Sequence, residues 1–298
     1  MTSKALTRTG LQRVVSAIDT LFPPQYADSR WDNTGLLIDS SVQDGNVDGK
    51  RPSVLLAVDL TSAVAQEAID KKVDLIIAYH PFIFRNWSRI TPQSNPQHQS
   101  AINLIQNNIS VHCPHTAVDA SINGVNDYLV KILTRGDYKL NKSIESINTS
   151  PVAQDEPLKE RLGFGRYVEL NNTTTALELI HRIKESLKLK NCMVSLPDKY
   201  DSLDSFKINS VALCAGSGSG VFKELSSEQD PDFYFTGELS HHEVLALKER
   251  GKCVVLVNHS NSERNFIQTE LKDKLQELLD DKVDIIVSAK DRDPLQFV

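Results

Sequence analysis

Hydrophobic residues recur along this chain in two patterns: short continuous runs, and longer segments in which they return every three to four positions. The first segment of the second kind covers residues 10–24, where leucines, valines and an isoleucine fall on one face. This helical period predicts an amphipathic helix packed on a core, with Thr9 as its N-cap and Pro23 and Pro24 at its end.

The first half of the chain then alternates apolar runs with helical segments. A run over residues 53–61 is followed by a helical segment over 62–72 and by a second run over 74–80. A polar loop near 85–98 precedes another helix and the run 109–115. Alternation of strand and helix is typical of a parallel sheet with helical crossovers.

The second half repeats this order after residues 136–160, which lose the apolar period and predict a polar connector. In the helix that follows, Thr175 and Glu178 have the spacing of a capping box. The later elements are, in chain order, strand 208–216, a glycine loop, helix 220–228, strand 232–242, helix 243–251, strand 252–260, helix 265–279 and strand 282–289.

The repeat predicts an α/β fold of two similar domains related by internal pseudo-symmetry. Domain one is expected to cover residues 1–135, with the C-terminal segment 264–298 packing back on it, and domain two residues 136–263. The length of 298 residues supports two domains, because single cores rarely grow beyond about 250 to 300 residues. Ligands of open α/β sheets bind beyond the carboxyl ends of the strands.

The composition is that of a folded protein without a special affinity for polyanions. Hydrophobic residues make up 40% and charged residues 24%, and 33 Lys and Arg against 39 Asp and Glu give a net charge of −6. This balance argues against direct nucleic-acid binding. No apolar run has the length of a membrane span, and no secretory signal is visible. We expect a cytoplasmic protein; mitochondrial import is the alternative, because basic residues precede the first acidic one.

Several common cofactor and catalytic motifs are absent. Gly216, Gly218 and Gly220 are spaced G-x-G-x-G, which matches neither the dinucleotide-binding fingerprint nor the P-loop, so this loop predicts a tight turn. No G-x-S-x-G sequence occurs. The cysteines are scattered singly, which argues against a disulfide framework and a thiolate zinc site. They are Cys113, Cys192, Cys214 and Cys253.

Histidines with carboxylates follow the strands of both halves. One strand ends at His115 with Asp119 four residues later, and its counterpart ends at His259 with Glu263 four residues later. His80 follows another strand. Imidazole with carboxylate suits zinc, iron or manganese. A single pair of this kind arises often by chance, whereas a duplicated pair at matched strand ends is more specific.

The order of motifs WDNTGLLI, YHPFIF, HTAVDASINGVND, GFGR, CAGSGSG, TGELSHHE and NHSNSE resembles the Nif-three-like family, the NGG-one-interacting factor three proteins. Many members of that family carry the name GTP cyclohydrolase type two. The resemblance runs through nearly the whole chain. It implies two α/β domains flanking a two-metal centre in the cleft between them, and a homo-oligomer, since bacterial members form ring-shaped hexamers.

The resemblance also implies a set of metal ligands, namely His80, Asp119, His259 and Glu263. Tyr79 stands where the family has a further histidine. A neutral phenol is a poor ligand because its pKa is near 10, so one or two divalent ions are expected. His115 and His242 match other recurrent positions, and the resemblance gives them catalytic or ligand-orienting roles, whereas His241 reads as a solvated residue.

Two functions follow from these motifs. The first is a metal-dependent hydrolase that acts on a nucleotide or another phosphorylated metabolite, with His115 or His242 as general acid or base. The second is a non-catalytic metal-binding protein that interacts with or regulates a protein partner such as a transcription factor. Loss of the histidine at Tyr79 fits the second reading.

Overall fold

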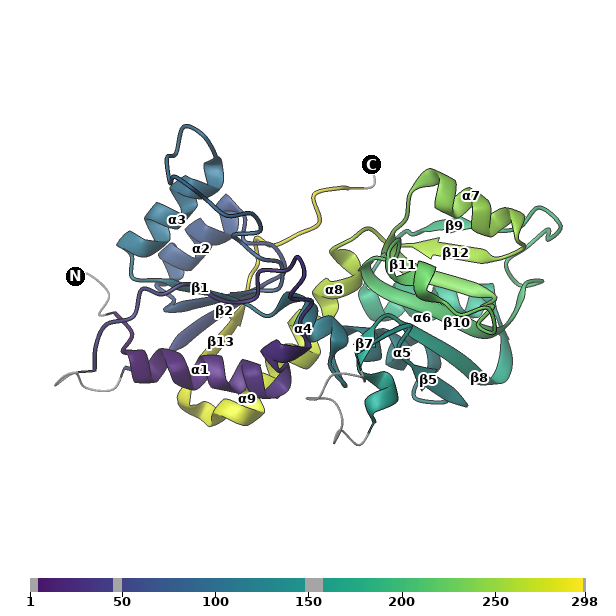
Figure 1. The fold of residues 1–298 in the computed structure, drawn as a ribbon, viewed down its shortest axis with the longest axis horizontal. Helices are drawn as coiled ribbons and strands as arrows, with labels where there is room; N and C mark the ends of the chain where they lie inside the picture. Colours follow the sequence, from purple (N-terminus) through teal and green to yellow (C-terminus); the bar gives the residue numbers. More distant parts are fainter. Residues whose placement is uncertain (1–4, 45–49, 148–157, 297–298) are drawn as a thin grey trace. The chain divides into compact units, whose positions relative to one another are not determined.

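Two large β-sheets and a small two-stranded one organise the chain in the computed structural model, which describes residues 5–44, 50–147 and 158–296 (Figure 1). Unit 1 comprises Met1–Val118 and Ile267–Arg292, and unit 2 comprises Asp119–Phe266 and Asp293–Val298. The mixed α/β class expected from the sequence is confirmed. The pseudo-symmetry and the domain ranges 1–135 and 136–263 stay predictions.

The sheet of unit 1 has the order β1-β4-β3-β2-β13, in which β1 is antiparallel to β4 and the other pairs are parallel. Helices α2 and α3 lie on one side of this sheet, and α1 and α9 lie on the other (Figure 1). The bounds are α1 Arg8–Leu21, β1 Gly35–Ile38, β2 Ser53–Ala57, α2 Ser62–Lys71, β3 Leu75–Ala78, α3 Pro96–Gln106, β4 Ser110–Cys113, α9 Lys272–Leu279 and β13 Asp284–Val287.

Alternation along the strands divides the core of unit 1 into two layers. Leu55, Ile76 and Val111 pack with Val64 of α2 and Leu104 of α3 in one buried cluster. The intervening strand positions point to the opposite face, which α1 and α9 cover. Since β2, β3 and β4 are parallel, their carboxyl ends meet at one edge of the sheet.

The first helix begins two residues earlier than the sequence predicts. The hydroxyl of Thr7, not that of Thr9, caps α1 by accepting a hydrogen bond from the backbone N–H of Gly10 at 3.2 Å. Thr9 lies inside the helix, where its hydroxyl donates to Asp44 at 2.5 Å. Either threonine could cap the helix by residue type. The sequence could not show that Thr9 bonds Asp44, which is 35 residues away, instead of capping α1.

The sheet of unit 2 has the order β5-β8-β10-β11-β12-β9, and its centre, β10-β11-β12, is parallel. Helices α5, α6 and α8 pack on one face, and α7 packs on the other against β12. The bounds are α4 His115–Ala120, α5 Val125–Thr134, β5 Leu140–Lys142, β6 Glu145–Ser146, β7 Gly163–Phe164, β8 Arg166–Thr175, α6 Ala176–Leu187, β9 Met193–Ser195, β10 Lys207–Ser217, β11 Phe233–Glu238, α7 His241–Glu249, β12 Cys253–Leu256 and α8 Asn261–Phe266.

Several predicted elements of the second half differ in the structure. The expected connector 136–160 contains β5 and β6, and its residues 148–157 lie outside the described residues. The expected helix 220–228 is only a short 3-10 turn, η4, Val221–Glu224. The last expected helix is divided by a π-helical segment, η5, Ile267–Leu271, that joins α8 to α9.

The predicted strand 232–242 was too long, because β11 ends at Glu238. Ser240 caps α7 instead: its hydroxyl accepts from the N–H of Glu243, and the Glu243 carboxylate accepts from the N–H of Ser240 at 2.9 Å. This capping box starts the helix at His241. The capping box that the sequence does predict is only half present, since Thr175 accepts from the N–H of Glu178 while the Glu178 side chain bonds Arg182.

A buried ion pair stabilises unit 2. The Nε of Arg166 lies 2.7 Å from Oδ1 of Asp127, and Arg166 is fully buried. Arg161 bonds the second oxygen of the same carboxylate. Three further guanidinium N–H groups of Arg166 donate to backbone carbonyls, among them that of Gly163 at 2.7 Å. Buried charges of this kind are tolerated only when such bonds compensate their desolvation.

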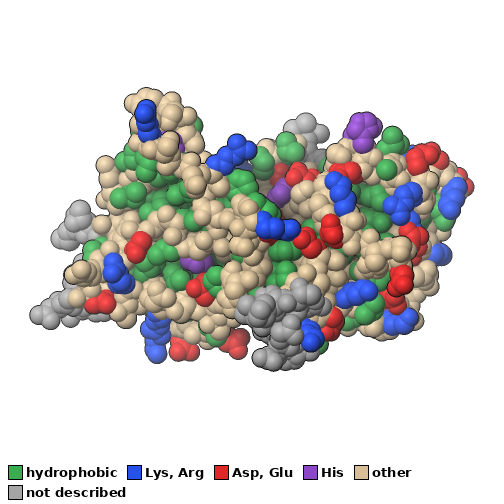
Figure 2. Space-filling view, viewed as in Figure 1, with side chains coloured by type: hydrophobic (Ala, Val, Ile, Leu, Met, Phe, Trp, Pro, Cys, Tyr) green, Lys and Arg blue, Asp and Glu red, His purple; other side chains and the backbone are tan. Residues whose placement is uncertain are grey.

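On the face shown in Figure 2, basic and acidic side chains are intermixed with hydrophobic ones. Within the described ranges, no helix combines the length and apolar character that a bilayer span requires.

Candidate metal centre

His80 of unit 1 lies just beyond the carboxyl end of β3. Its Nδ1 is 2.8 Å from Oδ1 of Asp59, which follows the neighbouring parallel strand β2. Asp59 is held in turn, because its backbone N–H and that of Val58 donate to the carboxylate of Asp291 at 3.3 and 2.8 Å. A carboxylate on one ring nitrogen directs the lone pair of a neutral imidazole to the other, as in many metal-binding histidines.

His115 follows β4 and has a backbone conformation that is rare for a side-chain-bearing residue, with a φ of +27°. Its Nδ1 lies 2.7 Å from Oδ1 of Asp32, and Thr116 donates to the other oxygen through its N–H, at 3.2 Å, and its hydroxyl. Burial opposes ionisation of Asp32, but these hydrogen bonds and the charge of His115 hold the pKa of the carboxyl below its usual value.

Tyr79 packs against both histidines of unit 1. Its ring meets that of His80 edge-on at a centroid distance of 5.2 Å and that of His115 at 5.8 Å. The rings of His80 and His115 are 5.5 Å apart. Tyr79 is 1% exposed, so a phenol occupies a nearly dry position beside both imidazoles.

The clearest donor pair lies in unit 2 at the carboxyl ends of β11 and β12. The Nδ1 of His259 is 2.9 Å from Oε1 of Glu238, and its Nε2 is 3.5 Å from Oε1 of Glu263. The side chain of Glu263 is 3% exposed and that of His259 is 40% exposed. One face of this histidine therefore meets solvent while the carboxylate beside it is buried, as suits a ligand pair that an ion can reach.

A glycine makes room for this pair. Gly216 ends the buried part of β10 with a φ of +63°. A Cβ at this position would lie 2.8 Å from both Oε1 of Glu263 and Nε2 of His259. The backbone at Gly216 therefore passes close to the two donor atoms, and any side chain at this position would occupy the space beside them.

Asp119 begins unit 2 within α4 and lies in the same neighbourhood as Glu263. Burial raises the pKa of the Cys214 thiol well above its usual value, and the charges of Asp119 and Glu263 raise it further. Asn126 fixes the local backbone, because its side-chain amide donates to the carbonyl of Asp119 at 3.0 Å and its oxygen accepts from the N–H of Ala215 at 2.9 Å.

His242 is exposed in the first turn of α7, with its ring 5.3 Å from that of His241. Over the described part of the chain it makes no hydrogen bond, ion pair or ring contact with His259 or Glu263. Its catalytic role stays a prediction.

The structure adds residues that the sequence analysis did not name. Asp32, Asp59 and Glu238 each orient one of the predicted histidines. A signal for two of them was present, since Asp59 and Glu238 stand at strand ends, where side chains of neighbouring parallel strands meet. Within each unit, imidazole nitrogens and carboxylate oxygens thus lie beside one another, and donors of these types suit a divalent ion such as zinc, iron or manganese.

The chain is similar to known proteins over nearly its whole length. A sequence model of Duf34/NIF3 (NGG1p interacting factor 3) matches residues 9–294. The chain is 47% identical to NGG1-interacting factor 3 of Saccharomyces cerevisiae over 98% of this chain and 99% of that protein. It is 30% identical to human NIF3-like protein 1, covering 97% and 92% of the two chains. The crystal structure of a Bacillus cereus protein related to NIF3 has a similar fold, with a TM-score of 0.75, 20% identity and coverage of 96% and 98%.

Proposed function

The chain belongs to the Duf34/NIF3 family, and we propose that it is a metal-dependent hydrolase that acts on a nucleotide or another phosphorylated metabolite. The observation that carries the proposal is the pair in unit 2, where Nε2 of His259 lies 3.5 Å from the buried Glu263 carboxylate. The motif resemblance suggests GTP cyclohydrolase type two chemistry as a first reaction to test.

The proposed ligands are Glu263, His259 and Asp119 of unit 2 and His80 of unit 1. The donor set fits a divalent ion because it combines anionic oxygens with imidazole nitrogens and leaves out thiolates. The space that Gly216 leaves beside two of these donors supports the assignment. A bound ion would supply a water nucleophile at neutral pH, since coordination lowers the pKa of water to about 7.

Residues of this chain perform the remaining tasks. Glu238 and Asp59 fix the ring orientation of His259 and His80 through their Nδ1 atoms. His115, paired with Asp32 at 2.7 Å, accepts a proton from the attacking water or donates one to the leaving group, because an imidazole held by a carboxylate is suited to both. His242 is the second candidate for this step.

The test combines metal analysis with a substrate screen. The purified protein is loaded with zinc, iron or manganese in turn and assayed against nucleotides, including GTP, and simple phosphoesters. Glu263→Ala is expected to abolish turnover and to lower metal content, and His80→Ala tests the contribution of unit 1. Glu249→Ala, an exposed acidic residue of α7, is the matched control and should behave as the wild type.

A second function is favoured by one observation, the name of the yeast relative, which is an interacting factor. In this alternative the chain binds a metal and a protein partner without catalysis. The nearly dry Tyr79, where the family pattern has a histidine, fits reduced catalysis. Metal binding without turnover in the screen, together with a partner that co-purifies only with metal-loaded protein, would favour this function over hydrolysis.

We also propose a homo-oligomer located in the cytoplasm, with mitochondria as the alternative location. Light scattering of the purified protein tests the first statement, and microscopy of a C-terminally tagged chain tests the second.

A further inference from the structure

A second candidate site lies on the α7 face of the unit 2 sheet. A cavity of about 750 Å³ opens between α7, η4 and the loop that follows η4. Its apolar lining consists largely of half-buried side chains such as Phe222, Leu225, Leu239 and Leu247. Pockets that hold small molecules have volumes of about 300 to 1,000 Å³ and an apolar lining with a few polar groups.

Tyr234 of β11 is a buried residue whose hydroxyl group makes it a polar part of this cavity. Tyr234 is 2% exposed and lines the cavity, and its ring packs edge-on against that of Phe222 at a centroid distance of 5.2 Å. No residue of the described chain forms a hydrogen bond with its hydroxyl. Burial raises the pKa of Tyr234 to about 12, so this hydroxyl keeps its proton. A ligand oxygen in the cavity can therefore accept a hydrogen bond from this hydroxyl.

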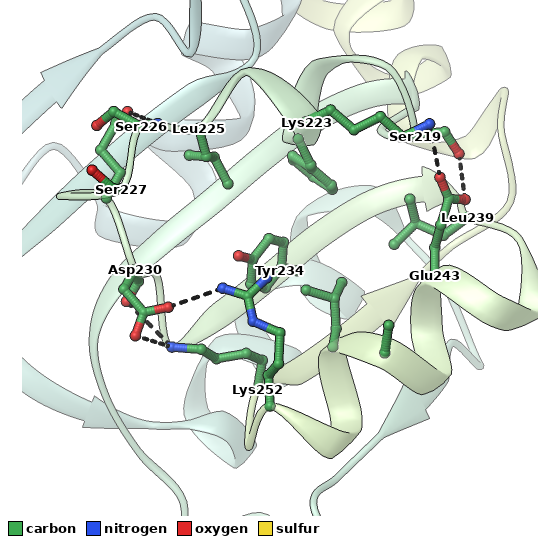
Figure 3. A pocket seen from close by; sticks show the side chains of 15 residues that line it. Ser219, Lys223, Leu225, Ser226, Ser227, Asp230, Tyr234, Leu239, Glu243 and Lys252 are labelled. Atoms are coloured by element: carbon green, nitrogen blue, oxygen red, sulfur yellow. Dashed lines mark hydrogen bonds and ion pairs between the residues drawn. The ribbon is translucent and has the colours of Figure 1, made fainter.

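Charged residues surround Tyr234 on two sides (Figure 3). Asp230 bonds Lys252 at 2.7 Å and Arg250 at 3.4 Å on one side, and Glu243 lies 3.7 Å from Lys223 on the other. The lining thus carries three basic groups against two acidic ones. Arg250 uses one nitrogen for Asp230, and the rest of its planar fork is suited to an oxyanion.

We propose that this cavity binds a planar aromatic molecule that carries one oxyanion, either a carboxylate or a phosphate. The ring lies against Phe222 and Tyr234, and the oxyanion accepts hydrogen bonds from the Tyr234 hydroxyl and from Arg250. The excess of one basic group over the acidic ones in the lining favours an anion, with a single charge for a carboxylate and nearly two for a phosphate monoester. Neither His259 nor Glu263 lines the cavity, so the site is distinct from the donor pair of the proposed metal centre.

The two possible sources of the oxyanion are separated by two probes. Isothermal titration calorimetry with 2-naphthoate tests an aryl carboxylate, and titration with adenosine monophosphate tests a nucleotide phosphate. Saturable one-to-one binding of either probe supports the site and names its ligand class. The absence of saturable binding for both probes up to millimolar concentration overturns the proposal.

Two variants of α7 test the location. Ala246 is exposed and lines the cavity, so Ala246→Phe fills it from a surface position and should weaken binding more than tenfold. Leu245 is its exposed neighbour and does not line the cavity, so Leu245→Phe is the matched control and should bind within twofold of wild type. Equal binding by the two variants would overturn the assignment.

Single-group variants test the chemistry. Tyr234→Phe keeps the ring and removes only the hydroxyl, and it should weaken binding about fivefold, as expected for one hydrogen bond. Arg250→Gln should weaken it about tenfold and reduce its salt dependence. Glu263→Ala should leave probe binding unchanged, so that failure of the metal centre and failure of this cavity are separate results. Unaltered binding by both Tyr234→Phe and Arg250→Gln would overturn the oxyanion assignment.

Discussion

The Nδ1 atom of His259 lies 2.9 Å from Oε1 of Glu238, a residue that precedes it by 21 positions. In unit 1, Nδ1 of His80 lies 2.8 Å from Oδ1 of Asp59, which also precedes it by 21 positions. In each case the carboxylate stands at the end of one parallel strand and the histidine beyond the end of the next strand in the chain. Both units therefore use the same strand–helix–strand spacing to orient an imidazole.

This relationship predicts the effect of removing Glu238. In Glu238→Ala, the His259 ring loses the group that fixes its orientation, and metal affinity should fall about 10- to 100-fold. Glu238→Gln keeps an oxygen that can accept from Nδ1 and should lose much less. Competition with a fluorescent zinc chelator measures both affinities. Equal affinities for wild type and Glu238→Ala would show that Glu238 does not support a metal ligand.

The sequence predicted where the central strands lie because parallel strands are buried on both faces and read as continuous apolar runs. The observed strands β3, β4, β11 and β12 each end two to four residues before the predicted end. The runs before His80, His115 and His259 are β3, β4 and β12. The spacing of four between His259 and Glu263 also corresponds to a real contact. The partners of these histidines were harder to predict, because they are brought together only after the sheets have formed. Asp59 and Glu238 lie 21 positions from their histidines, and Asp32 lies 83 positions from His115.

The predicted helix boundaries were wrong for a different reason. Local patterns place an apolar run and a polar turn, but a helix starts where its N–H groups find acceptors. At α7 the reciprocal bonds between Ser240 and Glu243 set that start, and His241 and His242 became helical although their residue types alone favour no element. The burial of Arg166 could not be predicted from the sequence either, since its counter-charge Asp127 lies 39 positions away.

Tyr79→His should raise metal stoichiometry toward two ions per chain. A phenol must lose a proton before it can coordinate a metal ion. The imidazole that replaces it offers a lone pair at neutral pH. Elemental analysis after dialysis against trace zinc or manganese gives the stoichiometry, with Tyr79→Phe as the control for loss of the hydroxyl. Two tightly held ions in the wild type, unchanged by Tyr79→His, would contradict the prediction.

Asp127→Asn should be among the most destabilising single changes in unit 2. It leaves the buried guanidinium of Arg166 without its counter-charge, which costs about 3 to 5 kcal/mol. Urea unfolding monitored by circular dichroism gives the change in the free energy of unfolding. Glu178→Gln, which removes the surface partner of Arg182, is the control and should cost about 0.5 kcal/mol.

The ion pair between Asp127 and Arg166 should also make the free energy of unfolding depend on pH. Burial opposes ionisation of Asp127, but the charges of Arg166 and Arg161 and their hydrogen bonds hold its pKa below the usual value. Since the folded pKa is the lower one, the stability from the pair is present above the unfolded pKa of about 4 and is lost as the pH falls toward the folded value. The loss of stability between about pH 4 and 2 should therefore be smaller in Asp127→Asn than in wild type.

Cys192 should react faster with a thiol reagent than the other three cysteines. Cys113, Cys214 and Cys253 are buried, and burial raises the pKa of Cys253 to about 12, whereas Cys192 is only partly covered. Because the thiolate is the reactive form, Ellman's reagent at pH 8 should titrate one thiol in the native chain and four in denaturant. Cys192→Ser should leave no rapidly reacting thiol. Rapid reaction of two or more native thiols would contradict the described packing.

Gly216→Ala should weaken metal binding through the backbone rather than through a ligand. The φ of +63° at this residue costs a side-chain-bearing residue about 1 to 2 kcal/mol. The new Cβ would also lie 2.8 Å from Oε1 of Glu263 and from Nε2 of His259, so one of these donor atoms must move. A displaced ligand should lower metal affinity at least tenfold. Gly220→Ala is the matched control, because this glycine of the same loop has a φ of −70° and open space where its Cβ would lie. Zinc competition should therefore separate the two variants by at least tenfold at similar thermal stability of the loaded proteins, and equal affinities would show that the donors at Gly216 do not hold the ion.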